Sequence, residues 1–222
     1  MNDFRSISSI LTNYENFFIL QDYHRGYSWQ SKHIVQLLRD IDSVVIEKND
    51  SYLYLSSIYY IKRENNNKEI YLELIDGYQR IATIMLILRE IINRVRNENP
   101  ENSNFEKFEM GLFDRGNNNK IRLTPYFYND SNNFFINYIT TGKVNLKLNQ
   151  NTDSLASELA LINSIALIKN FLSHEKIEFW GGFTKKLIER TSVNMIELSS
   201  NVNATEVYRS LNSKGMILDN TL

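Results

Sequence analysis

One segment in the first half of the chain combines a carboxylate, a glycine, an amide and an arginine. It runs from Ile75 to Arg80 with the sequence IDGYQR. The first N–H groups of a helix bind anions, glycine lets a ligand approach the backbone, and arginine can hold a phosphate through two hydrogen bonds. Asp76 could orient that arginine, hold a metal ion or polarise a water molecule. The segment predicts an anion-binding site, with an ordinary strand-to-helix turn capped by Asp76 as the open alternative.

A second segment, Tyr23–Trp29 (YHRGYSW), places three aromatic residues, a histidine and an arginine around a glycine. Aromatic rings stack on bases and on cations, and the arginine could clamp a phosphate. The alternative is a loop whose aromatic side chains close over the core. A third segment, Tyr208–Gly215 (YRSLNSKG), is a further candidate, although its glycine also suits the end of a helix.

Several classes of site find no support in the sequence. The chain has no cysteine, and its three histidines, His24, His33 and His174, are widely spaced. A disulfide framework and a thiolate metal site are therefore excluded, and a zinc site is poorly supplied with ligands. The sequence contains no phosphate-binding P-loop, Rossmann glycine motif or serine elbow.

The elements that position these segments follow from hydrophobic periodicity and turn residues. Strands are expected at Phe17–Leu20, Tyr52–Lys62, Glu69–Ile75, Ile121–Leu123 and Val193–Leu198. Helices are expected from Ser31, as the N-cap, to about Glu47, and at Gln79–Asn97, Asn129–Ile139, Leu155–Leu172, Phe179–Ile188 and Ala204–Leu211, with a turn at Asn212–Gly215. The second and third strands form a β-hairpin. This order predicts an α+β fold with a small mixed β-sheet and flanking helices, not a doubly wound fold.

Composition and charge limit the function further. The 222 residues carry 25 Lys and Arg against 26 Asp and Glu, which gives a net charge of -1. An autonomous nucleic-acid-binding domain usually shows a basic stripe, so nucleic acid could be bound here only through a local cluster. No apolar run approaches the ~20 residues that cross a bilayer, and the N-terminus lacks a secretory signal. A cytoplasmic protein with no membrane partner is expected.

Taken in this order, the motifs resemble the N-terminal domain of GmrSD-type, modification-dependent (type IV) restriction enzymes. That family shows a YQRGYxW loop, LLxDI at a helix end, a YxLGSI strand, IDGQQRLTTL opening a helix, and a later FxxLNSxGxxL. The matching stretches here are Tyr23–Trp29, Leu37–Ile41, Tyr54–Ile58, Ile75–Ile84 and Val207–Leu218. Ile121–Leu123 and Phe135–Gly142 also look family-like, so the resemblance covers nearly the whole chain.

The resemblance implies a nucleotide-binding core similar to ParB and sulfiredoxin over residues 1–100. A mostly helical continuation over residues 101–222 would pack on that core. The resemblance also implies binding and hydrolysis of a nucleoside triphosphate, GTP or another, with Mg²⁺ as an optional second cofactor. The catalytic role would fall to Asp76, Gln79 and Arg80. Nucleotide binding would fall to Arg25, Tyr27, Trp29, Gly77, Thr83 and Asn212, and no residue is assigned to a metal.

The same resemblance implies a sensor of modified phage DNA in an anti-phage restriction system. DNA cleavage would belong to a C-terminal nuclease domain or subunit. The sequence stops just after the LNSKG motif, so we expect a fragment without nuclease activity. A homodimer is kept as one form of assembly. The alternative function is a catalytically degenerate module of the same kind of system, which binds DNA or a protein partner.

Four positions depart from the family pattern. Tyr78 replaces the first glutamine of IDGQQR, and His24 replaces the glutamine of the loop. Ala82 replaces a threonine, and Ser56 replaces the glycine of the strand. Because Arg80 and the motif glycine are retained, we expect phosphate binding to survive these changes and hydrolysis to be slow.

Overall fold

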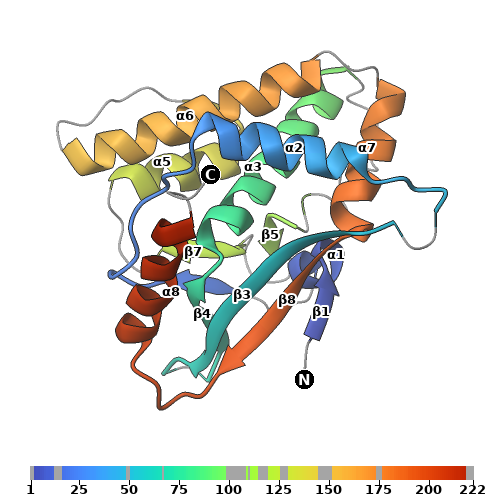
Figure 1. Cartoon of the computed structure of the whole chain (residues 1–222). Helices are drawn as coiled ribbons and strands as arrows, with labels where there is room; N and C mark the ends of the chain where they lie inside the picture. Colours follow the sequence, from blue (N-terminus) through green and yellow to red (C-terminus); the bar gives the residue numbers. More distant parts are fainter. Residues whose placement is uncertain are drawn as a thin grey trace.

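A mixed six-stranded sheet with helices packed around it forms the described part of the protein (Figure 1). The computed structural model describes residues 3–12, 17–48, 51–66, 68–98, 109, 111–114, 120–125, 130–144, 152–173 and 177–218. The strands of the large sheet are β1 (Asp3–Ser6), β2 (Phe18–Leu20), β3 (Leu53–Glu64), β4 (Ile70–Asp76), β7 (Leu123–Pro125) and β8 (Thr191–Leu198). A separate pair comprises β5 (Phe113–Asp114) and β6 (Lys120–Ile121). The helices are α1 (Ile7–Thr12), α2 (Ser31–Ser43), α3 (Tyr78–Glu98), α5 (Asp130–Thr141), α6 (Thr152–Ser173), α7 (Ile177–Glu189) and α8 (Ala204–Leu218).

The strand order in the large sheet is β1-β8-β3-β4-β2-β7. β3 runs antiparallel to β4 and parallel to β8, while β2 runs parallel to both β4 and β7. The expected α+β class and the expected hairpin are therefore confirmed. β8 comes late in the chain yet pairs with both β1 and β3. The two expected segments, 1–100 and 101–222, thus contribute strands to one sheet, and α5 to α8 lie in the second segment.

α3 is the central helix of the protein. It begins directly after β4 and passes behind α2 in the view of Figure 1. The periodicity of the sequence predicts a helix with one broad apolar face. Instead, every side chain from Ile81 to Ile92 is buried, including the charged Arg89 and Glu90. Contacts with α5 and α6 account for this burial, because they cover faces of the helix that a surface helix would expose.

α6 contains a stretch, Ser154–Ser173, that is long and apolar enough to cross a membrane by length and composition alone. Within the described residues it is the one such stretch, and it packs against α2, α3 and α5. The core helices of globular proteins pass the same test. This helix is therefore no indication of a membrane protein.

The structure corrects several expected boundaries. β1 and α1 precede the first expected strand, in a part of the chain where the sequence predicts no element. The N-cap of α2 is Gln30 rather than Ser31, and the helix ends at Ser43 rather than near Glu47. A hydrogen bond from the Gln30 backbone N–H to Nδ1 of the His33 side chain (3.0 Å) supports this earlier start. Both ends of α2 differ from the predicted ones because helix caps depend on individual hydrogen bonds, which hydrophobic periodicity does not report.

Two further expectations fail in the second half of the chain. The short strand expected at Ile121–Leu123 is divided, with Ile121 ending β6 and Leu123 starting β7. The turn expected at Asn212–Gly215 is absent, because α8 continues through it to Leu218. A single glycine inside a helix costs only about 1 kcal/mol, so Gly215 is too weak a signal to end α8 by itself.

Candidate functional site

The turn from β4 into α3 is built around a glycine that no other residue could replace without strain. Gly77 has φ +111°, and a Cβ atom there would lie 2.9 Å from Ile58 Cγ1. Its carbonyl accepts the first helical hydrogen bond, from Ile81 N–H (3.1 Å), so Gly77 and not Asp76 is the N-cap residue. The first N–H groups of α3 have no partner within the helix and can face a ligand.

Gln79 holds the loop between β2 and α2 against the start of α3. Its Oε1 accepts a hydrogen bond from Ser28 N–H (3.0 Å), and its Nε2 donates to the Gly26 carbonyl (3.2 Å). Both ends of the amide are therefore used by loop backbone that lies about fifty positions away in the sequence. The structure thus brings the motifs IDGYQR and YHRGYSW together, with Gln79 as the direct link between them.

Arg80 is positioned by a distortion in β3. The guanidinium Nη1 donates to the Ser57 carbonyl (2.7 Å). Ser57 follows Ser56, which has φ +72°, and the pairing of β3 with β8 changes register between Tyr54 and Ser57. This β-bulge turns a strand carbonyl towards the arginine. Arginine carries five donors, and among the described residues the other guanidinium N–H groups have no hydrogen-bond partner.

Tyr27 and Thr83 form a buried hydroxyl pair beneath this turn. The Thr83 hydroxyl donates to the Gln79 carbonyl (2.7 Å), and Tyr27 OH then donates to Thr83 Oγ1 (2.7 Å). Tyr27 is 1% exposed and Thr83 is fully buried, so neither presents a polar atom at the surface. Burial also raises the pKa of Tyr27. These two predicted nucleotide-binding residues lie in the core, where they hold the loop from below.

Tyr78 also points into the core. Its side chain is buried, and its ring lies perpendicular to that of Tyr27 at a centroid distance of 6.4 Å. Complete desolvation raises the pKa of its hydroxyl, so the phenol stays neutral. The residue that departs from the family pattern at this position is therefore part of the core packing.

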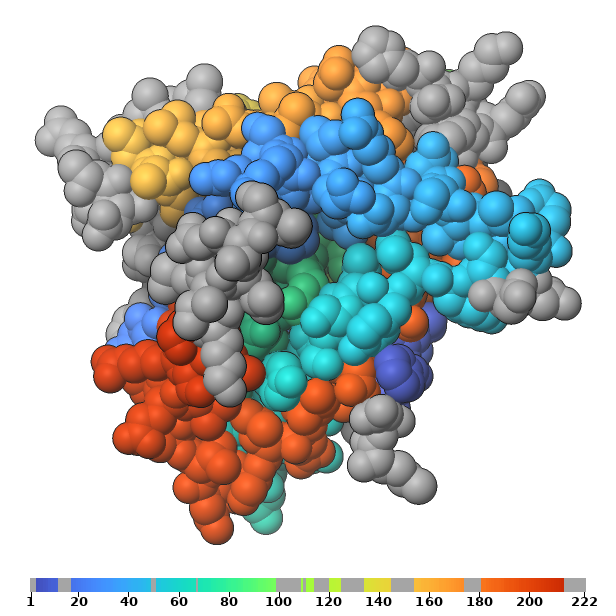
Figure 2. All heavy atoms as spheres, viewed as in Figure 1, coloured from blue at the N-terminus to red at the C-terminus, as the bar shows by residue number. Residues whose placement is uncertain are grey.

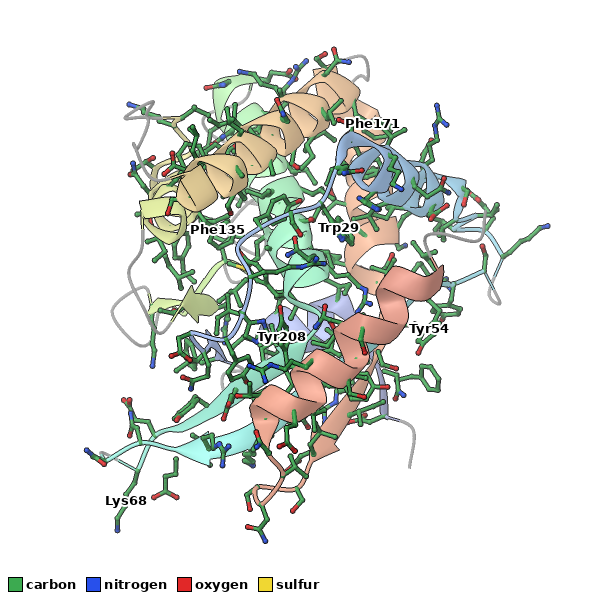
Figure 3. The ribbon with its side chains drawn as sticks, turned by 60° about the vertical axis from the view of Figure 1, so that its left-hand side comes forward. Trp29, Tyr54, Lys68, Phe135, Phe171 and Tyr208 are labelled. Carbon is green, nitrogen blue, oxygen red and sulfur yellow. The ribbon has the colours of Figure 1, made fainter. Side chains whose placement is uncertain are left out.

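The other end of the YHRGYSW loop is covered by α8. Tyr208 lies between α8 and the body of the protein (Figure 3), and its hydroxyl accepts a hydrogen bond from Arg25 N–H (3.2 Å). Its ring contacts those of Tyr23 and His24, at centroid distances of 5.4 and 4.7 Å. Asn212 donates from Nδ2 to the Tyr208 carbonyl (2.9 Å), a bond within α8 itself. The third motif of the sequence thus docks on the second.

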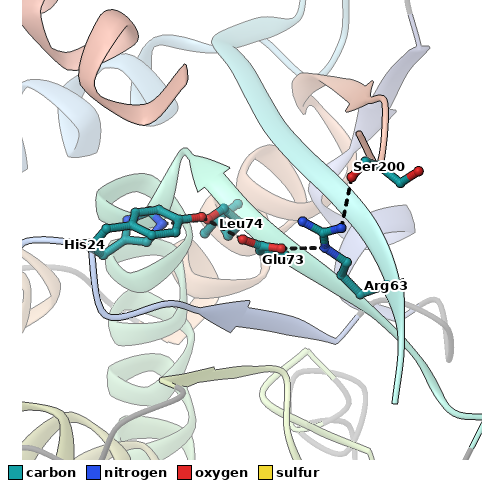
Figure 4. Close-up of polar contacts among 6 residues, drawn as sticks. His24, Arg63, Glu73, Leu74 and Ser200 are labelled. Atoms are coloured by element: carbon teal, nitrogen blue, oxygen red, sulfur yellow. Dashed lines mark hydrogen bonds and ion pairs between the residues drawn. The ribbon is translucent and has the colours of Figure 1, made fainter. Parts of the chain in front are cut away.

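A buried carboxylate ties this cluster to the hairpin. Glu73 is 5% exposed and accepts hydrogen bonds from Tyr23 OH (2.9 Å) and from Arg63 Nε (2.7 Å). Arg63 also donates from Nη1 to the Ser200 carbonyl (3.1 Å), as Figure 4 shows. Burial and the neighbouring Glu73 carboxylate raise the pKa of Tyr23. The loop, the β3–β4 hairpin and the turn before α8 are therefore joined by one polar network.

A pocket of about 410 Å³ opens beside Arg80. Besides Arg80, it is lined by Leu55 of β3. Its other wall consists of Trp29, just before α2, and five residues of α2: Lys32, His33, Gln36, Leu37 and Asp40. We call this space the α2 pocket. Figure 2 shows the hollow between α2 and β3, with α3 visible in its depth.

The α2 pocket contains two of the predicted site residues, Trp29 and Arg80. Trp29 is stacked with His33 at a centroid distance of 5.9 Å. Lys32, Gln36 and Asp40 are not among the site residues predicted from the sequence. Their spacing of four residues on the polar face of an amphipathic helix was the available signal, but any solvated helix face shows the same pattern.

The remaining predicted residues lie outside the α2 pocket. Arg25 and Asn212 are on the side covered by α8, and Asp76 is half-buried at the end of β4. The Asp76 carboxylate has no hydrogen-bond partner among the described residues. Among the described residues, no group of three His, Asp or Glu side chains is placed to hold a metal ion. His174 lies outside the described residues.

A comparison with protein-family models identifies the family of the chain. The model described as "GmrSD restriction endonuclease, N-terminal domain" matches residues 7–221, essentially the whole chain. A search of curated proteins gives no match.

Proposed function

The chain belongs to the GmrSD restriction endonuclease N-terminal domain family and is a component of a restriction system, in which we propose that it binds a nucleoside triphosphate at the start of α3. The phosphates would lie against the free N–H groups that follow Gly77, with Arg80 beside them. Trp29 and Lys32, which line the same pocket as Arg80, would complete the site.

The observation that supports this proposal best is the position of Arg80. One guanidinium nitrogen is held by the Ser57 carbonyl, while the side chain lines a pocket next to a glycine-capped helix N-terminus. A helix N-terminus and an arginine together attract phosphate, and the fixed guanidinium reduces the entropy lost on binding.

We further propose that hydrolysis uses Asp76. This carboxylate ends β4 directly before the N-cap glycine, and its lack of a hydrogen-bond partner among the described residues leaves it able to orient a water molecule or to bind Mg²⁺ with the phosphates. Hydrolysis would couple the sensing of modified phage DNA to cleavage by a nuclease domain or subunit.

The proposal is tested by calorimetric titration with the four common nucleoside triphosphates, with and without Mg²⁺. Arg80→Ala should weaken binding by about 1.5–3 kcal/mol, the scale of a lost charged hydrogen bond. Arg39→Ala is the matched control, because Arg39 is exposed on α2 and outside the pocket. Unchanged affinity in a folded Arg80→Ala protein, or no binding by the unaltered chain, would refute the site.

A second function is favoured by Gln79. Its amide is held by two hydrogen bonds to the loop backbone, which favours a structural role over the positioning of a water molecule. The domain could then bind a nucleotide, DNA or a protein partner without hydrolysis. Phosphate release that is lost in Asp76→Asn would support the enzyme, whereas tight nucleotide binding without phosphate release would support the binding module.

A further inference from the structure

Three polar side chains follow one another along the wall of the α2 pocket. Lys32, Gln36 and Asp40 occupy successive turns of α2, about 6 Å apart along the helix axis, and all three line the pocket. The charge therefore changes sign along this wall, from a cation near the start of α2 to a carboxylate near its end. A ligand lying along the wall would meet a cation at one end and hydrogen-bond acceptors at the other.

The acceptor end consists of two neighbouring oxygen atoms. Gln36 Nε2 donates to Asp40 Oδ1 (2.7 Å), which directs the donor of the amide towards the carboxylate. Gln36 Oε1 and Asp40 Oδ2 are left as acceptors, and an ionised carboxylate can only accept. Among the described residues Asp40 has no cationic partner, in contrast to Asp42, which pairs with Lys186 at 3.1 Å.

The rest of the α2 pocket suits a flat, partly apolar ring. Leu37 and Leu55 supply apolar surface, and Trp29 stacked with His33 supplies an aromatic face. Ligand pockets commonly combine such apolar walls with a few polar groups that fix orientation. At about 410 Å³ the pocket has the size of a small-molecule site.

We propose that the α2 pocket holds the base of the bound nucleotide, and that Gln36 and Asp40 select guanine. Guanine presents two adjacent donors on one edge, N1–H and the 2-amino group. Adenine presents the acceptor N1 beside its 6-amino donor, so one acceptor of the protein would face another acceptor. This inference rests on the proposed function, which places the triphosphate near Arg80 in the same pocket.

The test compares GTP, ITP and ATP by calorimetric titration. ITP keeps N1–H but lacks the 2-amino group, so binding should weaken from GTP to ITP to ATP, by about tenfold overall. Asp40→Asn should weaken GTP binding about tenfold and should not weaken ATP binding, because an amide places a donor where guanine needs an acceptor and adenine N1 does not. Glu47→Gln removes the same charge from an exposed residue outside the pocket and should keep the preference.

The exposed Gln36 provides a second variant if Asp40→Asn does not fold. Gln36→Ala removes one acceptor and should reduce the ratio of GTP to ATP affinity. Equal affinities for GTP and ATP, or a preference that both variants retain, would overturn the base site while the proposed function stands. If no nucleotide binds at all, both proposals fail. A guanine preference that disappears in the variants supports the inference.

Discussion

Gln79, Tyr27 and Thr83 are motif residues whose polar atoms all bond to the protein itself. Gln79 joins α3 to the loop, and the two hydroxyls form a buried pair below it. Arg80 and Asp76 differ from them, because each keeps polar atoms that no described residue satisfies. At the scale of single residues, the motif thus divides into groups that shape the site and groups that can meet a ligand.

His24 belongs to the residues that shape the site, and its protonation makes the stability of the folded protein depend on pH. Its Nε2 is bonded to the Leu74 carbonyl (2.6 Å) and therefore carries the proton of the neutral ring. Burial lowers its pKa, although the nearby Asp76 and Glu73 carboxylates act in the opposite direction. The unfolded chain then binds more protons than the folded chain below about pH 6.5.

We expect His24 to make the folded protein less stable as the pH falls below about 6.5, with no contribution above that value. His24→Gln should remove this part of the pH dependence, because its amide nitrogen can still donate to the Leu74 carbonyl. The measurement is urea unfolding at pH 7.5, 6.5 and 5.5 for both proteins. If the free energy of unfolding of the two proteins changed with pH in the same way, the pKa of His24 would be the same in the folded and the unfolded chain.

At the scale of elements, the bulge in β3 orients Arg80, because it presents the Ser57 carbonyl to the guanidinium. It places Ser56 in a backbone conformation that costs a residue with a Cβ atom about 1–2 kcal/mol. The family pattern has a glycine at this position, which fits the observed φ.

Ser56→Gly should therefore stabilise the protein by about 0.5–1 kcal/mol, after the greater entropy of glycine in the unfolded chain is subtracted. Ser57→Gly is the control, since Ser57 does not have a positive φ and should lose stability on substitution. Chemical denaturation measures both. A destabilised Ser56→Gly protein would mean that the serine side chain contributes more than the backbone strain costs.

The end of α5 depends on a second glycine. Gly142 has φ +70°, and its N–H donates to the Tyr138 carbonyl (2.8 Å) to close the helix. A Cβ atom there would overlap Asn93 Oδ1 and lie 2.6 Å from Arg89 Nη2. The buried Arg89 guanidinium occupies this space beside the negative end of α5, where a cation is favourable.

Gly142→Ala should destabilise the protein by about 2–4 kcal/mol, from backbone strain together with displacement of the buried Arg89. Gly181→Ala is the matched control: a Cβ at this helical glycine meets nothing within 4 Å, so stability should rise by about 0.5–1 kcal/mol. Thermal and chemical unfolding test the pair. Equal effects of the two substitutions would contradict the close packing described at Gly142.

At the scale of the whole molecule, β8 links the second half of the chain to the strands that the first half contributes to the sheet. It pairs with β1 and β3, while α5 and α6 cover α3. Residues 1–100 therefore contain the central helix and most of the sheet, but lack the strand that holds β1 and the helices that bury α3.

We expect a chain of residues 1–100 to remain unfolded or to aggregate, because unpaired strand edges and an uncovered apolar helix would be exposed to water. Circular dichroism and amide chemical shifts of this chain, compared with those of residues 1–222, provide the measurement. Cooperative unfolding of the short chain would show instead that residue 100 is a true domain boundary.

Much of the local structure could be predicted from the sequence. The hairpin, a helix directly after Asp76-Gly77 and most of α6, which was expected at Leu155–Leu172, follow from periodicity and turn residues, which act over a few positions. The matched family also follows from the order of the motifs along the chain. β1 and α1 could not be predicted, since these short elements are stabilised by partners that are distant in the chain, β8 and α7.

What only the tertiary structure decided is which polar groups are free. Gln79 reaches the loop backbone at Gly26 and Ser28, and Arg80 reaches the Ser57 carbonyl. These partners lie 23 to 53 positions away in the chain, so no local pattern reports them. By itself the sequence determined the residue types at the turn and therefore the chemistry available there. The fold determined which of them support the backbone and which face the α2 pocket, because a hydrogen bond depends on distance in space and not in sequence.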